Sequence, residues 1–328
     1  LESRFLCGSR RVYTAFRQAT DAVMDPKAFL RAKVLEMRQR HVKYEDTPYS
    51  LEPNCKESPG GLRDLQVILW IGRAAGLGES WNDLARRGYI TRGEALQLKG
   101  LETFLRHVRI RLHLLTARRE DRLLFDHQEA VAGRFGISAG KARRASELLM
   151  QRYFRTAKSV TQLNTILLQN LGAEIFPEPN KVPIVINERF QMDHELLDVR
   201  AEDVFEKNPP AILESFHLMQ QRSELKGMTA RTLRALWRAR RLVGPGFRRD
   251  PGNRAMFLQL FQQKRGLVHE LRRMNQYGIL GRYLPAFRRI VCQMQHDLFH
   301  AYTVDQHILM VVRNLRRFAL PEFAHEYP

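Results

Sequence analysis

Apolar residues that recur at helical spacing dominate this chain. The clearest run has apolar side chains at positions i, i+3, i+4, i+7, i+11 and i+14, namely Leu101, Phe104, Leu105, Val108, Leu112 and Leu115. Such a run places its apolar side chains on one face of a helix, and Arg106, Arg109 and Arg111 then fall on the opposite face. The run therefore predicts a long amphipathic helix.

The same period returns around residues 141–171, 212–219 and 233–237. Between the first two, the stretch FPEPNKVPIVINERFQMD holds three prolines, which stop helices, and Ile184–Ile186 is the one extended segment that we expect. We place a domain boundary there, and we interpret the Gly/Pro-rich residues 242–256 as a loop that joins helices. The prediction is a mainly α fold.

The composition sets the class of protein. With 44% hydrophobic and 27% charged residues in a chain of 328, we expect a globular protein of two or three domains. No run of about 18 apolar residues occurs, so we expect no transmembrane helix. Cys7, Cys55 and Cys292 are scattered, which favours a reducing, cytoplasmic setting. Both ends read like the middle of a longer chain, and we expect a fragment.

The formal charge of +19 and the isoelectric point near 10.4 are high. A surface of this kind attracts nucleic acid, nucleotide phosphates or an acidic protein partner. The alternative is a set of solvated arginine-rich helix faces, and this alternative stays open.

Two adjacent glycines precede a predicted helix in the stretch SLEPNCKESPGGLRDLQ. It is neither a P-loop, because Lys56 comes before the glycines, nor a Rossmann fingerprint. Gly60 and Gly61 allow positive φ or a close approach of the backbone, and Lys56 and Arg63 could add charge for a phosphate or an acidic partner.

An ordinary turn is the alternative for the same stretch. In that interpretation Ser58 is the N-cap of the helix, Pro59 is its first residue, and Arg63 pairs with a neighbouring acid.

Histidines gather near the end of the chain. On one continuous helix His296, His300 and His307 would share a face and could hold a metal. However, Thr303 and Gln306 form a capping-box pattern, which predicts that a helix starts at Thr303 and puts His307 on or near its buried face.

Two further groups carry little by themselves. The adjacent pair His296–Asp297 is only a dipeptide match to a metal-binding doublet, and we reject it. Asp121, Asp126 and His127 could serve general acid–base chemistry. We instead expect Asp126 to cap a helix that a glycine ends. The residue chemistry thus predicts no complete active site.

Beyond these motifs, the segment YSLEPNCKESPGGLRDLQVILWIGR (49–73) closely resembles bacterial bifunctional uridylyltransferase/uridylyl-removing enzymes, which modify the PII nitrogen-regulatory protein. Four more stretches are similar to the same family in the same order: LESRFLCG, RLLFDHQEAVAGRFG, YFRTAKSVTQLNTILLQ and MQHDLFHAYTVDQHILMVVRNLRRF. The resemblance covers essentially the whole chain.

The resemblance implies a division of the chain. Residues 1–172 would be the helical part of the uridylyltransferase region, following a polymerase-β-like core that precedes this chain. Residues 173–200 would be a Pro-rich linker, 201–285 a helical connecting region, and 286–328 the beginning of an HD hydrolase domain. Two glutamine-sensing ACT domains would also be absent.

Site residues follow from the resemblance as well. Lys56 and Arg63 would direct charge toward UTP or PII, Gly60 and Gly61 would permit backbone approach, and Asp64 would orient Lys56 or Arg63. His307 would correspond to the first metal-ligand histidine of the HD domain, which reverses the residue-based expectation. None of these residues is expected to be catalytic.

The implied reaction is transfer of UMP from UTP to a tyrosine of PII, with Mg²⁺ (or Mn²⁺) held by aspartates outside this chain, and hydrolysis of the product. We expect the fragment itself to be inactive, with PII, UTP and glutamine as partners of the complete enzyme, and neither a membrane nor nucleic acid among them. The hypotheses from other classes are a basic helical module that binds nucleic acid or protein, and a standalone HD phosphohydrolase.

Overall fold

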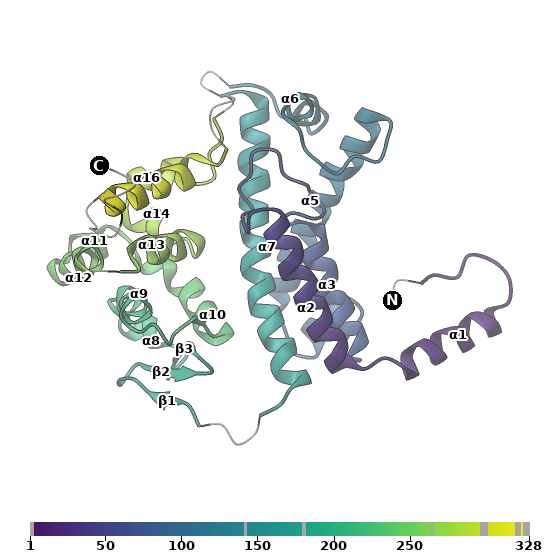
Figure 1. Ribbon diagram of the computed structural model, residues 1–328, viewed down its shortest axis with the longest axis horizontal. Coiled ribbons are helices and arrows are strands. Elements are labelled where there is room, and N and C mark those ends of the chain that lie inside the picture. Colours follow the sequence, from purple (N-terminus) through teal and green to yellow (C-terminus); the bar gives the residue numbers. More distant parts are fainter. Residues whose placement is uncertain are drawn as a thin grey trace. The chain divides into compact units, whose positions relative to one another are not determined.

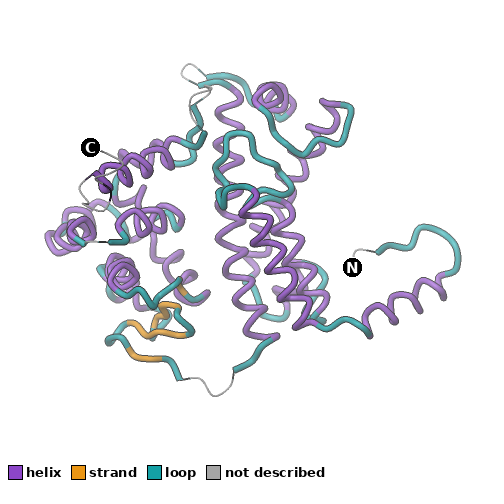
Figure 2. Tube along the Cα trace, in the orientation of Figure 1, coloured by secondary structure: helices purple, strands orange, loops and turns teal. Residues whose placement is uncertain are grey.

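The computed structural model describes residues 3–140, 143–178, 182–263, 265–295, 301–318 and 323. Helices dominate, and the few strands are short and gathered in one region (Figures 1 and 2). The mainly α prediction is confirmed. Among the described residues, no helix combines the length and the apolar character that crossing a membrane requires.

The chain forms two compact units that do not follow the order of the sequence. The first comprises Leu1–Pro48, Glu52–Gly136 and Arg155–Pro179, and the second comprises Tyr49–Leu51, Ile137–Phe154 and Asn180–Pro328. The division into four segments expected from the sequence stays a prediction.

Helices joined by loops make up the described part of the first unit. Its helices are α1 (Arg10–Ala22), α2 (Pro26–Lys43), α3 (Leu62–Ala74), α4 (Trp81–Arg86), α5 (Arg92–Thr116), α6 (Phe125–Arg134) and the later turns of α7 (Ala145–Ile175). Helix α3 packs against α2 and α5, and α5 also packs against α4 and α6 (Figure 1).

The apolar residues that recur at helical spacing along α5 form its buried face. Four of its predicted apolar side chains, Phe104, Leu105, Val108 and Leu112, are 5% exposed or less. Thr91 and Glu94 form a capping box at its start, and Ala117 ends it in the left-handed conformation. The long amphipathic helix predicted from the sequence is therefore confirmed.

The second unit contains a small four-stranded sheet in the order β1-β2-β3-β4. Its strands are β1 (Ile184–Val185), β2 (Phe190–Asp193), β3 (Leu196–Val199) and β4 (Gly227–Met228). β1 and β3 pair antiparallel to β2, and β4 pairs parallel to β3. The predicted extended segment at residues 184–186 is confirmed as β1, but the sequence interpretation missed the other three strands.

The missed hairpin has an uncommon turn. His194 and Glu195 connect β2 to β3 with φ of +48° and +61°. Two positive φ values match the turn that two-residue hairpins favour, but asparagine and glycine are its usual residues. Without that turn signal, strands of four residues were not visible in the sequence.

Helices make up the rest of the second unit. They are α8 (Val204–Lys207), α9 (Ala211–Gln221), α10 (Ala230–Ala239), the 3₁₀ helix η1 (Arg240–Leu242), α11 (Pro245–Arg249), α12 (Pro251–Gln262), α13 (Leu267–Gln276), α14 (Leu280–Tyr283), α15 (Pro285–Ile290) and α16 (Val304–Phe318). Helix α13 packs against α9, α14 and α16.

The prediction of a loop over residues 242–256 was wrong, because α11 and the first half of α12 lie within this segment. Pro245 and Pro251 each stand at the first position of a helix. Proline is tolerated there because the first turn leaves its N–H groups unpaired in any case. The prolines thus mark helix starts and not a loop.

Candidate functional site

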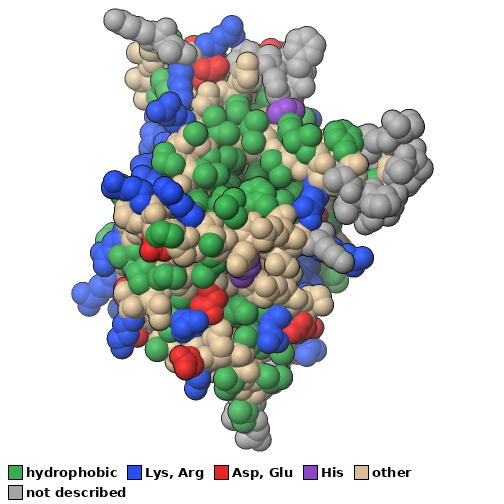
Figure 3. All heavy atoms as spheres, turned by 90° about the vertical axis from the view of Figure 1, so that its left-hand side faces the viewer, with side chains coloured by type: hydrophobic (Ala, Val, Ile, Leu, Met, Phe, Trp, Pro, Cys, Tyr) green, Lys and Arg blue, Asp and Glu red, His purple; other side chains and the backbone are tan. Residues whose placement is uncertain are grey.

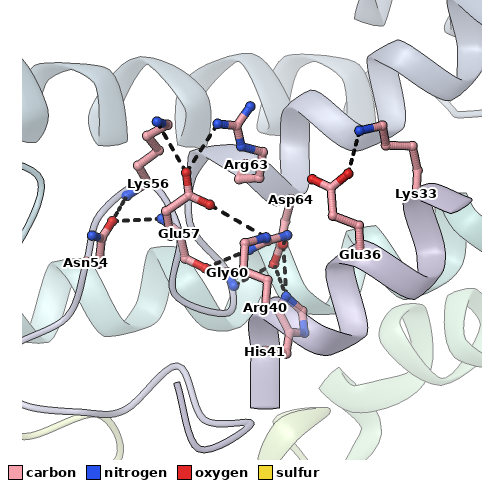
Figure 4. A network of polar contacts seen from close by, with 10 residues as sticks. All are labelled: Lys33, Glu36, Arg40, His41, Asn54, Lys56, Glu57, Gly60, Arg63 and Asp64. Atoms are coloured by element: carbon pink, nitrogen blue, oxygen red, sulfur yellow. Dashed lines mark hydrogen bonds and ion pairs between the residues drawn. The ribbon is translucent and has the colours of Figure 1, made fainter. Parts of the chain in front are cut away.

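The stretch before α3 is a tight turn built by two side chains (Figure 4). The Oδ1 atom of Asn54 accepts hydrogen bonds from the backbone N–H groups of Lys56 (3.0 Å) and Glu57 (2.8 Å). Ser58 Oγ accepts from the N–H of Asn54 at 2.9 Å. Because this hydroxyl closes the turn, it does not cap the helix. The predicted Ser58 N-cap was wrong, and α3 begins after Gly61.

The two glycines are required by close backbone contacts. Gly60 has φ of +77°, and a Cβ atom added there would lie 2.4 Å from the carbonyl oxygen of Ala157 in α7. A Cβ on Gly61 would lie 2.8 Å from the carbonyl oxygens of Lys56 and Ser58. The predicted positive φ and close approach are confirmed at Gly60. The group approached is a helix of the same unit, so the space beside the glycines is already filled.

Asp64 is a buried anchor between α2 and α3. Its carboxylate accepts from the N–H of Gly60 at 2.7 Å, from Arg40 Nη2 at 2.6 Å, and lies 2.9 Å from His41 Nε2. Burial raises the pKa of Asp64, but the hydrogen bonds and charges of His41 and Arg40 outweigh it and the pKa is lowered. The carboxylate is therefore held in its charged form.

The expectation that Asp64 orients Lys56 or Arg63 was wrong, since its partners are Arg40 and His41 at the end of α2. The signal that sequence reasoning missed is the pair of adjacent basic residues in the last turn of α2. Nothing along the sequence indicates which acid such a pair meets.

Lys56 and Arg63 share one carboxylate. Lys56 Nζ and Arg63 Nη2 each lie 3.2 Å from Glu57 Oε1, and the Arg63 guanidinium lies 5.1 Å from the Trp70 ring centre. Burial raises the pKa of Glu57, but Arg63 and Lys56 outweigh it and the pKa is lowered. The alternative in which Arg63 pairs with a neighbouring acid is confirmed.

Limited charge remains available in this network. The side chains of Lys56 and Arg63 are 19% and 23% exposed, and Glu57 partly neutralises both. Among the described residues, this network joins cations to a carboxylate and does not join a nucleophile to a base. It can fix the start of α3 and present part of two cations at the surface.

The group around Asp121 is a second ion cluster. Asp121 Oδ1 lies 2.6 Å from Arg109 Nε and 3.1 Å from His113 Nε2, both in α5. Asp126 lies in the first turn of α6, whose N-cap is Leu124, so the predicted cap was wrong. Asp121 therefore works with α5 and not with Asp126 and His127 as an acid–base group.

The proposed metal ligand lies on α16. The helix starts at Val304, as the capping pattern predicted, although the buried hydroxyl of Thr303 finds no hydrogen-bond partner among the described residues. His307 is exposed, so its expected place on or near the buried face was wrong. The buried face instead carries Asp305, which accepts from the N–H of Cys292 (3.1 Å) and from Asn275 (2.8 Å).

Within the described ranges, no group of three or more histidine, cysteine or acidic side chains could hold a metal ion. His296, Asp297 and His300 lie outside the described residues. The described residues therefore do not form a divalent metal centre by themselves.

A pocket of about 520 Å³, lined mostly by charged residues, lies in the first unit, and the sequence did not indicate it. It is lined by Arg73, Gly76, Gly78, Glu79, Asp83, Arg86 and Arg87. Its charges largely satisfy one another, because Arg73 pairs with Glu79 and Arg86 with Asp83.

Comparison with known proteins shows which families this basic, mainly helical chain matches. Residues 28–168 match the family model described as GlnD PII-uridylyltransferase, and residues 190–283 match the one described as uridylyltransferase GlnD third domain. No solved structure matches the chain.

Curated relatives align with the whole chain. A bifunctional uridylyltransferase/uridylyl-removing enzyme of Aromatoleum aromaticum is 63% identical over 328 residues, which are 100% of this chain and 38% of that protein. The enzymes of the same name from Nitrosospira multiformis and Bordetella parapertussis are 57% and 58% identical, again over 100% of this chain, which spans 37% and 38% of their lengths.

The fold and charge thus define a basic helical region without a complete catalytic site among its described residues. This chain belongs to the bifunctional uridylyltransferase/uridylyl-removing enzyme family. It spans less than two fifths of the length of these relatives.

Proposed function

We propose that this chain is part of a bifunctional enzyme that transfers UMP from UTP to a tyrosine of PII and hydrolytically removes it. The observation that carries the proposal is the 63% identity over all 328 residues to a relative whose name states both activities. The description of the matching family model names PII as the protein acted upon.

A chimera tests this assignment. The chain replaces the aligned 328 residues of the Aromatoleum aromaticum relative. We expect the chimera to uridylylate PII and to remove UMP at rates within about tenfold of the parent enzyme. A chimera that folds, as judged by its thermal transition, but lacks both activities would overturn the proposal.

In this proposal the chain contributes shape and charge, and the metal chemistry requires residues beyond those described. Mg²⁺ or Mn²⁺ would serve the complete enzyme, and His307 would supply one ligand at the uridylyl-removing site. Glutamine would act as an effector of the complete enzyme. The scattered, free cysteines support a cytoplasmic location.

Lys56 and Arg63 would lend charge to UTP or PII. Their partial exposure and their shared partner Glu57 leave some positive potential at the surface. Gly60, Gly61 and Asp64 would act by holding the turn beneath these two cations.

Calorimetric titration of the chain with PII tests this role, with and without UTP and Mg²⁺ and at two salt concentrations. We expect saturable binding that Lys56→Ala/Arg63→Ala weakens at least tenfold. The control is Arg86→Ala/Arg118→Ala, which removes equal charge from side chains that are 79% and 68% exposed. Equal weakening by both pairs would mean that only net charge matters.

A further inference from the structure

One segment of the second unit holds far more positive charge than its own acids neutralise. Between Ala230 and Gln295 the sequence has fourteen arginines and one lysine, against the two carboxylates of Asp250 and Glu270. Figure 3 views the molecule from the side on which α11 and α12 lie in Figure 1, and Lys and Arg groups outnumber Asp and Glu groups on that face.

Neither internal carboxylate is available to this surface. Asp250 caps α12, where its Oδ1 accepts from the N–H of Asn253 at 2.8 Å. Glu270 is 1% exposed and pairs with Arg273 at 2.7 Å. In the described part of the unit, acids from outside this segment form ion pairs with Arg231 and Arg238.

Ten arginines of the segment have no carboxylate partner among the described residues. They are Arg240, Arg241, Arg248, Arg249, Arg254, Arg265, Arg272, Arg282, Arg288 and Arg289. Most lie on exposed helix surfaces, where water solvates the charge at little cost. Arg240, Arg248 and Arg282 differ, because all three are partly buried.

Two of these arginines lie against the turn between α13 and α14 and against α14, which carries the third. Arg248 Nη1 donates to the carbonyl oxygen of Arg282 at 3.0 Å. The Arg240 guanidinium lies 4.7 Å from the ring centre of Trp237. A Cβ added to Gly278 in the turn would lie 3.9 Å from Arg240 Nη1. The guanidinium groups of Arg240 and Arg248 therefore lie beside the backbone of this turn and of α14, the helix that carries Arg282.

The environment of Arg240 is electrostatically unfavourable without a counter-ion. Burial lowers the pKa of Arg240, and the neighbouring charge of Arg282 lowers it further. Guanidinium groups bind phosphate through paired, charge-assisted hydrogen bonds, and an uncompensated charge in a partly desolvated place gains most from such a partner.

We propose that Arg240, Arg248 and Arg282 form a binding site for the phosphate groups of a small anionic ligand. The shared chemistry is that of a polyphosphate, either free or as the phosphate chain of a nucleotide. The exposed arginines on the neighbouring helices would raise the local concentration of such an anion. This site is independent of the proposed uridylyl transfer and removal.

Calorimetry on the 328-residue chain with inorganic tripolyphosphate and with UTP, each at about 0.15 M salt, tests the site. We expect saturable binding at one site, which Arg240→Gln and Arg282→Gln each weaken at least tenfold. Arg265→Gln is the matched control, because it removes the same charge from an exposed arginine, and it should change the affinity less than twofold. UTP binding much tighter than tripolyphosphate would identify a nucleotide as the source of the phosphates.

Thermal unfolding separates binding from folding. Without ligand, Arg240→Gln should unfold at the same temperature as the parent or higher, because it removes an uncompensated charge. Tripolyphosphate should raise the transition temperature of the parent and of Arg265→Gln, but not that of Arg240→Gln.

Two results would overturn the proposal. One is equal weakening in all three variants, which marks generic attraction. The other is binding only to a single-stranded oligonucleotide, with the same loss in every variant and a steep dependence on salt. If Arg240→Gln does not fold, the comparison of the affinities of Arg282→Gln and Arg265→Gln for tripolyphosphate tests the proposal by itself.

Discussion

The carboxylate of Asp64 lies 2.6 Å from the guanidinium of Arg40, and the Asp64 side chain has no exposure to solvent. This ion pair joins the last turns of α2 to the first turn of α3. The same carboxylate accepts the N–H of Gly60, so it also holds the turn that leads into α3. A single buried acid thus organises the stretch that the resemblance places near the proposed ligand surface.

Replacing Asp64 with asparagine should strongly destabilise the chain, because Arg40, whose side chain is 9% exposed, would lose its fully buried partner and keep only the longer 3.7 Å pair with Glu57. We expect a loss of about 3–5 kcal/mol in the free energy of unfolding. Urea unfolding followed by circular dichroism measures it. The control is Glu79→Gln, whose side chain is 55% exposed and pairs with Arg73, and its loss should be about 1 kcal/mol. Equal losses would contradict the anchoring role of Asp64.

Acid should weaken the same anchor. The pKa of Asp64 is lowered in the folded chain, so its contribution is complete above the ordinary carboxyl pKa of 3.8 and disappears as the pH falls through the lowered value. The stability difference between the parent chain and Asp64→Asn should therefore stay constant from pH 7 to about 5 and shrink below pH 3.8. Unfolding curves across this range measure it, and a difference that shrinks already near pH 6 would contradict the lowered pKa.

Gly60→Ala should be much more costly than an alanine at another left-handed glycine. The new Cβ would lie 2.4 Å from the carbonyl oxygen of Ala157, whereas Gly76, with φ of +67°, has open space around its Cβ position. We expect a loss of about 3 kcal/mol or more at Gly60, against about 1 kcal/mol at Gly76 from backbone strain alone. Urea midpoints of the two variants compare them, and similar values would mean that α7 moves away easily.

The stability of the second unit should depend on Glu270. Burial raises the pKa of this carboxyl from 4.5 to about 7, although Arg273 opposes the shift. As the pH rises from 4.5, the unfolded carboxyl ionises first, so the folded state loses stability until about pH 7.

Glu270→Gln removes this ionisation. The free energy of unfolding of the variant should therefore rise relative to that of the parent between pH 4.5 and 7, by about 3 kcal/mol in total. Urea unfolding at several pH values measures the gain, and Glu224→Gln, at an exposed position of the same unit, serves as the control. If the difference in stability between the variant and the parent did not vary with pH, the raised pKa of Glu270 would be contradicted.

Thiol reactivity should differ sharply among the three cysteines. Cys7 is exposed, whereas Cys55 and Cys292 are buried. Burial raises the pKa of Cys55 to about 12, so little thiolate forms. A disulfide reagent at pH 8 should label one thiol rapidly and the other two only in denaturant. The variant Cys7→Ser should lose the rapid phase, and rapid labelling that survives in it would show that a buried thiol is accessible.

Much of the fold could be predicted because its information is local. The period of apolar residues on α5 is a property of consecutive residues, and so are the prolines that stop α7 before β1. The remaining strands were missed because they are two to four residues long, and their hairpin turns through His194 and Glu195 and not through glycine. Pro251 was misinterpreted because the same residue serves a loop or the first turn of a helix.

The candidate site divides in the same way. That Gly60 needs positive φ or a close neighbour was predictable from the residue type, and so was an acidic partner for Arg63. The sequence did not show that the neighbour of Gly60 is Ala157 or that Asp64 contacts Arg40 and His41. These contacts join segments that come together only in the fold. Contacts between distant segments leave no periodic trace in the sequence.

By itself, the sequence determined the helical character of the chain, its excess of positive charge and the family to which it belongs. These properties depend on residue types and their order. Only the tertiary structure decided which charges are neutralised. It buries Asp64 against two basic residues and leaves Arg240 without an acid among the described residues, because burial and proximity are properties of packed elements and not of the residues themselves.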